Sequence, residues 1–364
     1  MKYDVIGSYL PPVEFLEAKE AYEAGRISAD DLKNAEDKAV STVIERQLEA
    51  GLGLITSGEV RRRFWDWDFY FNLEGITRER VDSGRIYQDM ESFTDVMRFA
   101  GRIGVNKEHP FIANFKYLDR VLDGRASALQ TLPSPSELYL RILTSDTSLG
   151  GNLYPEPECL LSDIAGAYNG TLKALYEAGC RNVQFDDTVC GRMCDFVFLK
   201  GLIQGGIDAI KLQNDIVNLL NASIEGIPSD MNISLYMSSG PTVVPEWRST
   251  SMPDNIMHKV LAEVKVGTFM LPFNISRPED LSVLSHLPAG KSVALGVINA
   301  HSPFPDDVAM VKEFVREAVR EYPALTFSIS PQTGFKVSSY AMRGLLFEDQ
   351  WNKIAELKSI AAEL

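Results

Sequence analysis

Short apolar runs alternate with long amphipathic stretches along this chain. Several runs, such as VALGVI at 293–298, are apolar on successive positions rather than on alternate ones. That pattern is typical of parallel strands covered on both faces. Eight such runs have the length of strands: Val5–Tyr9, Leu54–Glu59, Ala128–Pro133, Asn182–Asp187, Ile233–Ser238, Thr268–Phe273, Ser292–Asn299 and Thr326–Pro331.

The stretches between these runs have the apolar spacing of helices. Ser28 and Asp31 match the pattern of a capping box, and helical spacing then extends over Ala35–Ala50 and stops at Gly51. Three later stretches have the same character: Asp163–Ala178, Asp306–Glu321 and Glu348–Leu364.

Eight strand-like runs with helical connections predict one (β/α)8 barrel over residues 1–364. An open doubly wound sheet is the alternative. No linker rich in Pro, Gly or Ser divides the chain. The segment at about 77–116 is too long for a simple connection, so we expect a hairpin or extra helices there, near the barrel mouth.

Composition narrows the choice of partners to small molecules. Lys and Arg number 36 against 50 Asp and Glu, a net charge of −14, which disfavours nucleic acid and anionic membranes as partners. No apolar run approaches the roughly 20 residues that span a bilayer, and the N-terminus lacks the pattern of a signal peptide. We therefore expect a cytoplasmic protein, and the sequence leaves open whether it forms a homo-oligomer.

Four cysteines in a chain of this length do not suggest a disulfide framework. Cys190 and Cys194 are four residues apart, so in a helix they would share a face and could hold a metal. Two ordinary buried thiols are the simpler interpretation.

In such a barrel the active site forms at the C-terminal ends of the strands. Polar residues at those ends are Ser8, Glu59, Asp186, Asp187, Tyr236, Ser238, Asn274, Asn299, His301 and Thr333. A buried carboxylate is costly without a partner, so Glu59, Asp186 and Asp187 require one. A substrate ammonium would satisfy them, and so would an internal arginine from positions 61–63.

Five segments resemble motifs of the cobalamin-independent methionine synthase family, in family order: IGSYLPP (6–12), SGEVRRRFWDWDF (57–69), VQFDDTV (183–189), INAHSP (298–303) and SPQTGFK (330–336). The likeness is to the catalytic C-terminal barrel and its shorter single-barrel relatives, over nearly the whole chain. It implies a (β/α)8 fold of the methionine synthase and uroporphyrinogen decarboxylase type. It also implies an amino-acid thiol substrate, methyltetrahydrofolate as co-substrate and a place in amino-acid biosynthesis.

The resemblance assigns roles to individual residues. By it, Ser8 helps to hold the amino-acid carboxylate, and Glu59 and Asp186 receive the ammonium. His301 supplies a proton during methyl transfer. The aspartate that accompanies this histidine in the family is replaced here by Asn299, and an amide cannot stabilise an imidazolium as a carboxylate does.

The family's zinc ligands, by the same resemblance, correspond to Tyr236, Ser238, Asn274 and Thr333 in this chain. Neutral hydroxyls and an amide are weak zinc donors beside thiolate, imidazole and carboxylate. We therefore predict that zinc is absent. Without zinc to remove its proton, a thiol is mostly protonated at neutral pH. Methyl transfer is then either independent of zinc or directed to another acceptor.

An aromatic cluster at 65–71 follows the second strand. Packing in the core or in a lid explains it, and the alternative is a wall on which a pterin stacks. Arg61, Trp65 and Ser134 are the candidates for contacts with a folate or a carboxylate.

The favoured hypothesis is thus a methionine-synthase-like methyltransferase that binds an amino acid or thiol. Two alternatives remain: a metal-free decarboxylase with the same barrel, and a non-catalytic protein that binds a small molecule.

Overall fold

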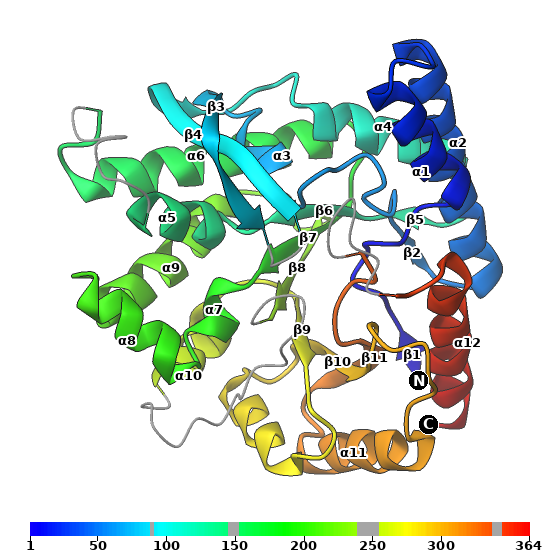
Figure 1. Ribbon diagram of the computed structural model, residues 1–364. Coiled ribbons are helices and arrows are strands. Elements are labelled where there is room, and N and C mark those ends of the chain that lie inside the picture. Colours follow the sequence, from blue (N-terminus) through cyan, green and yellow to red (C-terminus); the bar gives the residue numbers. More distant parts are fainter. Residues whose placement is uncertain (88–90, 145–152, 239–254, 337–343) are drawn as a thin grey trace.

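A parallel sheet forms the centre of the molecule, and helices surround it (Figure 1). The computed structural model describes residues 1–87, 91–144, 153–238, 255–336 and 344–364. The sheet has seven strands in the order β1-β11-β10-β9-β8-β7-β6. Their bounds are Lys2–Tyr3 for β1, Gln130–Pro133 for β6, Asn182–Asp187 for β7, Asn232–Met237 for β8, Thr268–Pro272 for β9, Ser292–Ile298 for β10 and Thr326–Pro331 for β11.

A further parallel pair extends this sheet. Strand β2 (Leu54–Ile55) pairs with β5 (Ser127–Ala128), and β5 leads through Leu129 directly into β6. The strand series therefore begins at β1 and ends at β2. Within the described residues no ladder joins β1 to β2, and we call this gap the seam.

Two hydrogen bonds cross the seam just past both strands. Thr56 Oγ1 donates to the Gly7 carbonyl at 2.6 Å, and the Tyr9 amide donates to the Gly58 carbonyl at 3.0 Å. The first and last strands of the series thus lie side by side, which is the arrangement of a TIM-barrel type of fold with an open seam.

The first two predicted strands are longer than the observed ones. The structure ends β1 at Tyr3, so the prediction of a strand over Val5–Tyr9 is wrong. Gly7 has a φ of +108°, and a Cβ there would lie 2.9 Å from a methyl group of Thr56. The run is apolar because it is buried beside β2, and burial alone does not make a strand. Likewise β2 ends at Ile55 instead of Glu59.

The predicted helices are confirmed. Helix α2 (Ala29–Ala50) starts at the Ser28 and Asp31 capping box and ends at Gly51 in the left-handed conformation. The other predicted stretches are α6 (Pro157–Glu177), α11 (Val308–Glu321) and α12 (Phe347–Glu363). Further helices are α1 (Val13–Glu23), α3 (Trp67–Tyr70), α4 (Pro110–Leu122), α5 (Pro135–Thr144), α7 (Val189–Arg192), α8 (Phe196–Gln204), α9 (Ala209–Ser223), α10 (Asn255–Glu263) and a 3-10 helix at Pro278–His286.

An antiparallel hairpin and the start of α4 occupy the segment at 77–116. Its strands are β3 (Glu74–Tyr87) and β4 (Glu91–Gly104), and residues 88–90 lie outside the described part of the chain. The hairpin packs against α6, where Arg102 and Asp163 form an ion pair at 2.6 Å (Figure 1). No helix among the described residues is both long and apolar enough to cross a membrane.

Candidate functional site

Glu59 follows β2 and has an uncommon backbone conformation. Its φ is 55°, in the left-handed region that residues other than glycine seldom adopt and that often marks functional sites. Lys336 holds this conformation, because its Nζ donates to the Glu59 carbonyl at 2.7 Å and to the Arg62 carbonyl at 2.8 Å. Burial of the ammonium lowers the pKa of Lys336 to about 8. The sequence analysis did not single out Lys336, although it ends the SPQTGFK motif.

The carboxylate of Glu59 is buried and has internal partners. Its Oε1 accepts a hydrogen bond from Thr131 Oγ1 at 2.7 Å and lies 3.0 Å from the Arg62 guanidinium. Arg62 also donates to Thr131 Oγ1 at 2.7 Å and stacks over the Phe111 ring at 4.3 Å. The sequence left two possible partners open for Glu59, a substrate ammonium and an internal arginine. The structure pairs Glu59 with the internal arginine Arg62.

Asp186 has no such cation. It lies at the C-terminal end of β7 with 9% of its surface exposed, and Gln184 Nε2 donates to its Oδ1 at 2.7 Å. Within the described residues it forms no ion pair. Burial raises the pKa of Asp186 well above its ordinary value, and the charge of Glu59 raises it further. Without a cation beside it, the ionised form of Asp186 is therefore disfavoured.

Asp187, next to it, has a different environment. It is fully buried and accepts hydrogen bonds from Ser134 Oγ at 2.6 Å, from the Cys190 amide at 2.7 Å and from Ser136 Oγ. These bonds fix the turn between β6 and α5. The Ser134 hydroxyl is directed at Asp187 and is itself fully buried, so it presents no surface to a folate or carboxylate ligand.

Glu137 is a second buried carboxyl group beside Asp187, which the sequence analysis did not identify. Burial, reinforced by the charge of Asp187, raises the pKa of Glu137 to about 7. The amide of Thr188 donates to its Oε1. Its position in the first turn of α5 gives no pattern that sequence alone would distinguish from a surface residue.

His301, Thr333 and Ser8 meet around one loop. His301 Nε2 lies 3.1 Å from the Gly334 carbonyl and 3.2 Å from Thr333 Oγ1, and Ser8 Oγ donates to the Lys336 carbonyl at 3.3 Å. A Cβ on Gly334 would lie 1.9 Å from Ser8 Oγ, so only glycine permits this contact. The loops after β1, β10 and β11 therefore bring these residues together.

The Gly334 carbonyl can only accept, so Nε2 carries the proton of the neutral His301 ring. Among the described residues, Asn299 forms no hydrogen bond with the His301 ring. Its Oδ1 accepts from the His301 amide at 2.9 Å and so shapes the loop.

The four positions that the family resemblance equates with zinc ligands do not form a zinc site of the ordinary kind. The Tyr236 hydroxyl donates to the Gln332 carbonyl at 3.0 Å, and burial raises its pKa further above the neutral range. Asn274 Oδ1 accepts from the Ser276 amide, Thr333 Oγ1 donates to the Gly334 carbonyl, and Ser238 is buried. No group of three or more His, Cys, Asp and Glu side chains in the described ranges is placed to hold a metal. This donor set does not fit zinc.

The structure supports the interpretation of Cys190 and Cys194 as two buried thiols. Cys190 and Cys194 are both buried, and burial raises the pKa of Cys194 to about 12. A thiol with so high a pKa is a poor metal ligand at neutral pH.

Arg61 and the aromatic cluster have separate environments. Arg61 forms ion pairs with Glu36 and Asp37 of α2 and stacks over Tyr117 at 4.8 Å. It is therefore directed toward α2 and α4, and its charge is balanced there. Trp65 is half-buried, whereas Trp67, Phe69 and Tyr70 are core residues. Of this cluster, Trp65 and Phe71 are the aromatic residues that retain exposed surface for contact with a flat ligand.

The model of the family described as "Cobalamin-independent synthase, Catalytic domain" matches residues 156–343. The chain belongs to this family. This confirms the resemblance that the motifs indicate. Among curated relatives, the uncharacterized protein YxjH of Bacillus subtilis is 25% identical, covering 99% of this chain and 94% of its own length. A methionine synthase of Saccharolobus solfataricus is 21% identical, covering 99% and 95%.

Two solved structures confirm the barrel type predicted from the sequence. A proposed vitamin-B12-independent methionine synthase from Listeria monocytogenes has a TM-score of 0.75 and 26% identity, covering 100% of this chain and 97% of its own. A B12-independent methionine synthase from Shewanella sp. W3-18-1, solved with selenomethionine, has a TM-score of 0.65 and 18% identity, covering 99% and 96%. At that identity the second match shows the fold alone.

Proposed function

We propose that this family member binds an α-amino acid at the barrel mouth, with the ammonium between Asp186 and Glu59. One observation carries the proposal: Asp186 is a buried carboxyl group beside Glu59, and Arg62 forms its close ion pair with Glu59 while its charge acts on Asp186 from a greater distance. An arriving ammonium would supply the missing positive charge and favour the ionised form of Asp186. Ser8, half-buried in the loop after β1, is the residue we assign to the substrate carboxylate.

We further propose that the bound amino acid carries a thiol, which is methylated without zinc. In the balanced reaction the bond from the methyl carbon to N5 of methyltetrahydrofolate breaks and a carbon–sulfur bond forms. The proton lost by the thiol is the one that N5 gains. His301 is the candidate side chain here whose ordinary pKa lies near neutrality, so we assign it the movement of that proton. Tyr236 is unsuited to this role because its raised pKa keeps it protonated.

The two alternatives have less support. A decarboxylase acting on several carboxylates needs an arginine-rich mouth, but Arg61 is paired with α2 and Arg62 with Glu59. A non-catalytic binding protein would keep the amino-acid site without turnover, and assays separate it from the enzyme.

The test measures methyl transfer from methyltetrahydrofolate to homocysteine, cysteine and other amino-acid thiols. The full chain is treated with a chelator, dialysed and assayed with and without added zinc. We expect product from at least one thiol, at a rate that zinc leaves unchanged. His301→Gln should lower kcat about 100-fold or more, while His258→Gln, at a surface position, should not. Turnover only with zinc, or no turnover with any thiol, contradicts the proposed reaction.

A further inference from the structure

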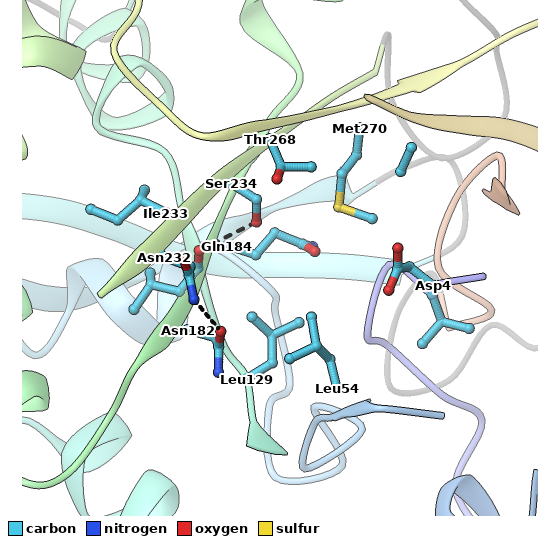
Figure 2. Close-up of a pocket in the computed structure, with 13 residues that line it drawn as sticks. Asp4, Leu54, Leu129, Asn182, Gln184, Asn232, Ile233, Ser234, Thr268 and Met270 are labelled. Carbon is cyan, nitrogen blue, oxygen red and sulfur yellow. Dashed lines mark hydrogen bonds between the residues drawn. The ribbon is translucent and has the colours of Figure 1, made fainter. Parts of the chain in front are cut away.

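A cavity of about 110 Å³ lies inside the barrel at the amino-terminal ends of the strands (Figure 2). We call it the basal cavity. Leu54 at the start of β2 and Thr268 at the start of β9 line it, together with Asp4, Gln184 and Ser234. Asp186, at the carboxyl end of β7, marks the opposite edge of the sheet. The basal cavity therefore lies toward the opposite end of the barrel from the proposed amino-acid site, and Gln184, which donates to Asp186, connects the two.

Gln184 presents an acceptor without a donor to this cavity. The side chain is fully buried, and its Nε2 donates to the Ile6 carbonyl and to Asp186 Oδ1, each at 2.7 Å. The Ile6 carbonyl can only accept a hydrogen bond, so the atom that faces it is the amide nitrogen. The Oε1 atom is buried and has no hydrogen-bond donor among the described residues. A buried amide oxygen without a donor is costly, so the cavity should hold something that supplies positive charge or a proton.

Asp4 supplies a carboxyl group to the same space. Figure 2 shows the Asp4 carboxyl and the Gln184 amide directed toward each other across the cavity. Asp4 is half-buried, Ser328 donates a hydrogen bond to it, and the charge of Lys2 acts on it. It forms no ion pair in the part of the chain that the structure describes. Water could donate to Gln184 Oε1, whereas a cation would contact Gln184 Oε1 and also pair with the Asp4 carboxylate.

We propose that the basal cavity binds a small monovalent cation: K⁺, Na⁺ or ammonium. Asp4 balances one positive charge, and Gln184 Oε1 is a neutral oxygen ligand. The Ser234 hydroxyl donates to the Val183 carbonyl at 3.3 Å and keeps lone pairs for a cation. An all-oxygen set with a single carboxylate suits a hard cation of charge one better than a divalent ion or a soft metal.

Such an ion would join two strands that are not neighbours in the sheet. Asp4 follows β1 and Gln184 is in β7, and four strands separate β1 from β7 in the sheet order. The ion would reinforce the barrel beside the seam, where β1 pairs with β11 on one side and, among the described strands, with none on the other. The effect to measure is therefore stability, which does not depend on the proposed amino-acid chemistry.

Thermal unfolding of the full chain tests this. The melting temperature is compared in KCl, NaCl, NH₄Cl and choline chloride at equal ionic strength. At ten times the Kd we expect one or more of the three small cations to raise Tm by about 2 °C over choline. Asp4→Asn should abolish the difference, and Asp119→Asn, an exposed carboxylate on α4, should preserve it. Equal Tm values in all four salts would overturn the proposal.

A second measurement covers the case in which Asp4→Asn does not fold. Crystals of the wild-type chain are grown with thallium(I), which replaces K⁺ and scatters anomalously. We expect an anomalous peak in the basal cavity in contact with the Asp4 carboxylate and Gln184 Oε1. Ordered water there without an anomalous peak would show a solvent-filled cavity and contradict the proposal.

Discussion

Single buried side chains determine the backbone around the mouth and at the ends of its helices. Lys336 stabilises the left-handed conformation of Glu59 through two carbonyls. His109 caps α4 in a comparable way, since its Nδ1 accepts from the Phe111 amide at 3.2 Å and its Nε2 donates to the Phe69 carbonyl at 3.0 Å. Both side chains act through hydrogen bonds to main-chain atoms, and each bonds at least one carbonyl that is distant from it in sequence.

We predict that His109 makes the protein sensitive to acid. Burial lowers the pKa of its imidazole from 6.5 to about 4. The unfolded state therefore binds the proton first, and the free energy of unfolding falls as the pH drops from about 6.5 through 4. For the full shift the loss is about 3 kcal/mol.

Urea unfolding at pH 7 and pH 4 measures this loss. His109→Asn keeps a capping acceptor but does not titrate, so its loss between the two pH values should be smaller by that amount. Equal losses in the wild type and the variant would contradict the prediction. His258→Asn, at an exposed position, is the control.

The polar residues at the strand ends could be predicted from the sequence. The side chains that contact them from distant parts of the chain could not. Glu59 and Asp186 were predicted because each follows an apolar run. Gln184 was missed, although a signal existed: residues two apart on a strand share a face, so Gln184 lies on the same side of β7 as Asp186. The environments of Arg61 and Ser134 depend on Glu36, Asp37 and Asp187, and no local pattern reveals those contacts.

At the level of elements, two glutamines replace missing sheet hydrogen bonds near the seam. Gln47 of α2 is fully buried, and its Oε1 accepts from the Thr56 amide at 3.0 Å while its Nε2 donates to the Thr56 carbonyl at 2.8 Å. Gln350 of α12 forms the same pair of bonds with Leu10, at 2.8 and 3.2 Å. The helices thus satisfy backbone groups that the short β1 and β2 leave without ladder partners.

Gln47→Leu should therefore be strongly destabilising. The change leaves both the amide and the carbonyl of Thr56 without these partners in a buried place, which costs about 2 to 4 kcal/mol. Denaturant unfolding measures the difference. Gln204→Leu, at the exposed end of α8, should change stability by less than about 0.5 kcal/mol. A loss of similar size in both variants would show that Gln47 does not have this role.

The same elements show why the strand predictions were accurate in the later barrel and less so at its start. Runs such as Asn182–Asp187 and Thr268–Phe273 are buried over most of their length, so an apolar run and a strand coincide. Val5–Tyr9 is equally apolar but leaves the extended conformation at Gly7. Apolar runs report burial, and only the backbone conformation decides between strand and loop.

At the scale of the whole molecule, the fold is that of the family, but the residues at the positions equated with zinc ligands do not suit zinc. The chain has the barrel type of methionine synthases, yet hydroxyls and an amide occupy the positions that the resemblance equates with zinc ligands. The acidic pair at the mouth is the feature that remains for substrate binding. We therefore expect an amino-acid ammonium to bind between Asp186 and Glu59 and to favour the ionised form of Asp186.

Calorimetric titration with L-methionine and L-homocysteine at pH 6 to 8 tests that claim most directly. Because the raised pKa disfavours the ionised form of Asp186 without ligand, affinity should increase as the pH rises through that pKa, by up to about tenfold per unit. Asp186→Asn should weaken binding about 30-fold or more and remove the pH dependence, whereas Asp119→Asn should change neither. The analogue of methionine without its amino group should not bind. Wild-type affinity and pH dependence in Asp186→Asn, or equal binding of the analogue, would contradict the account.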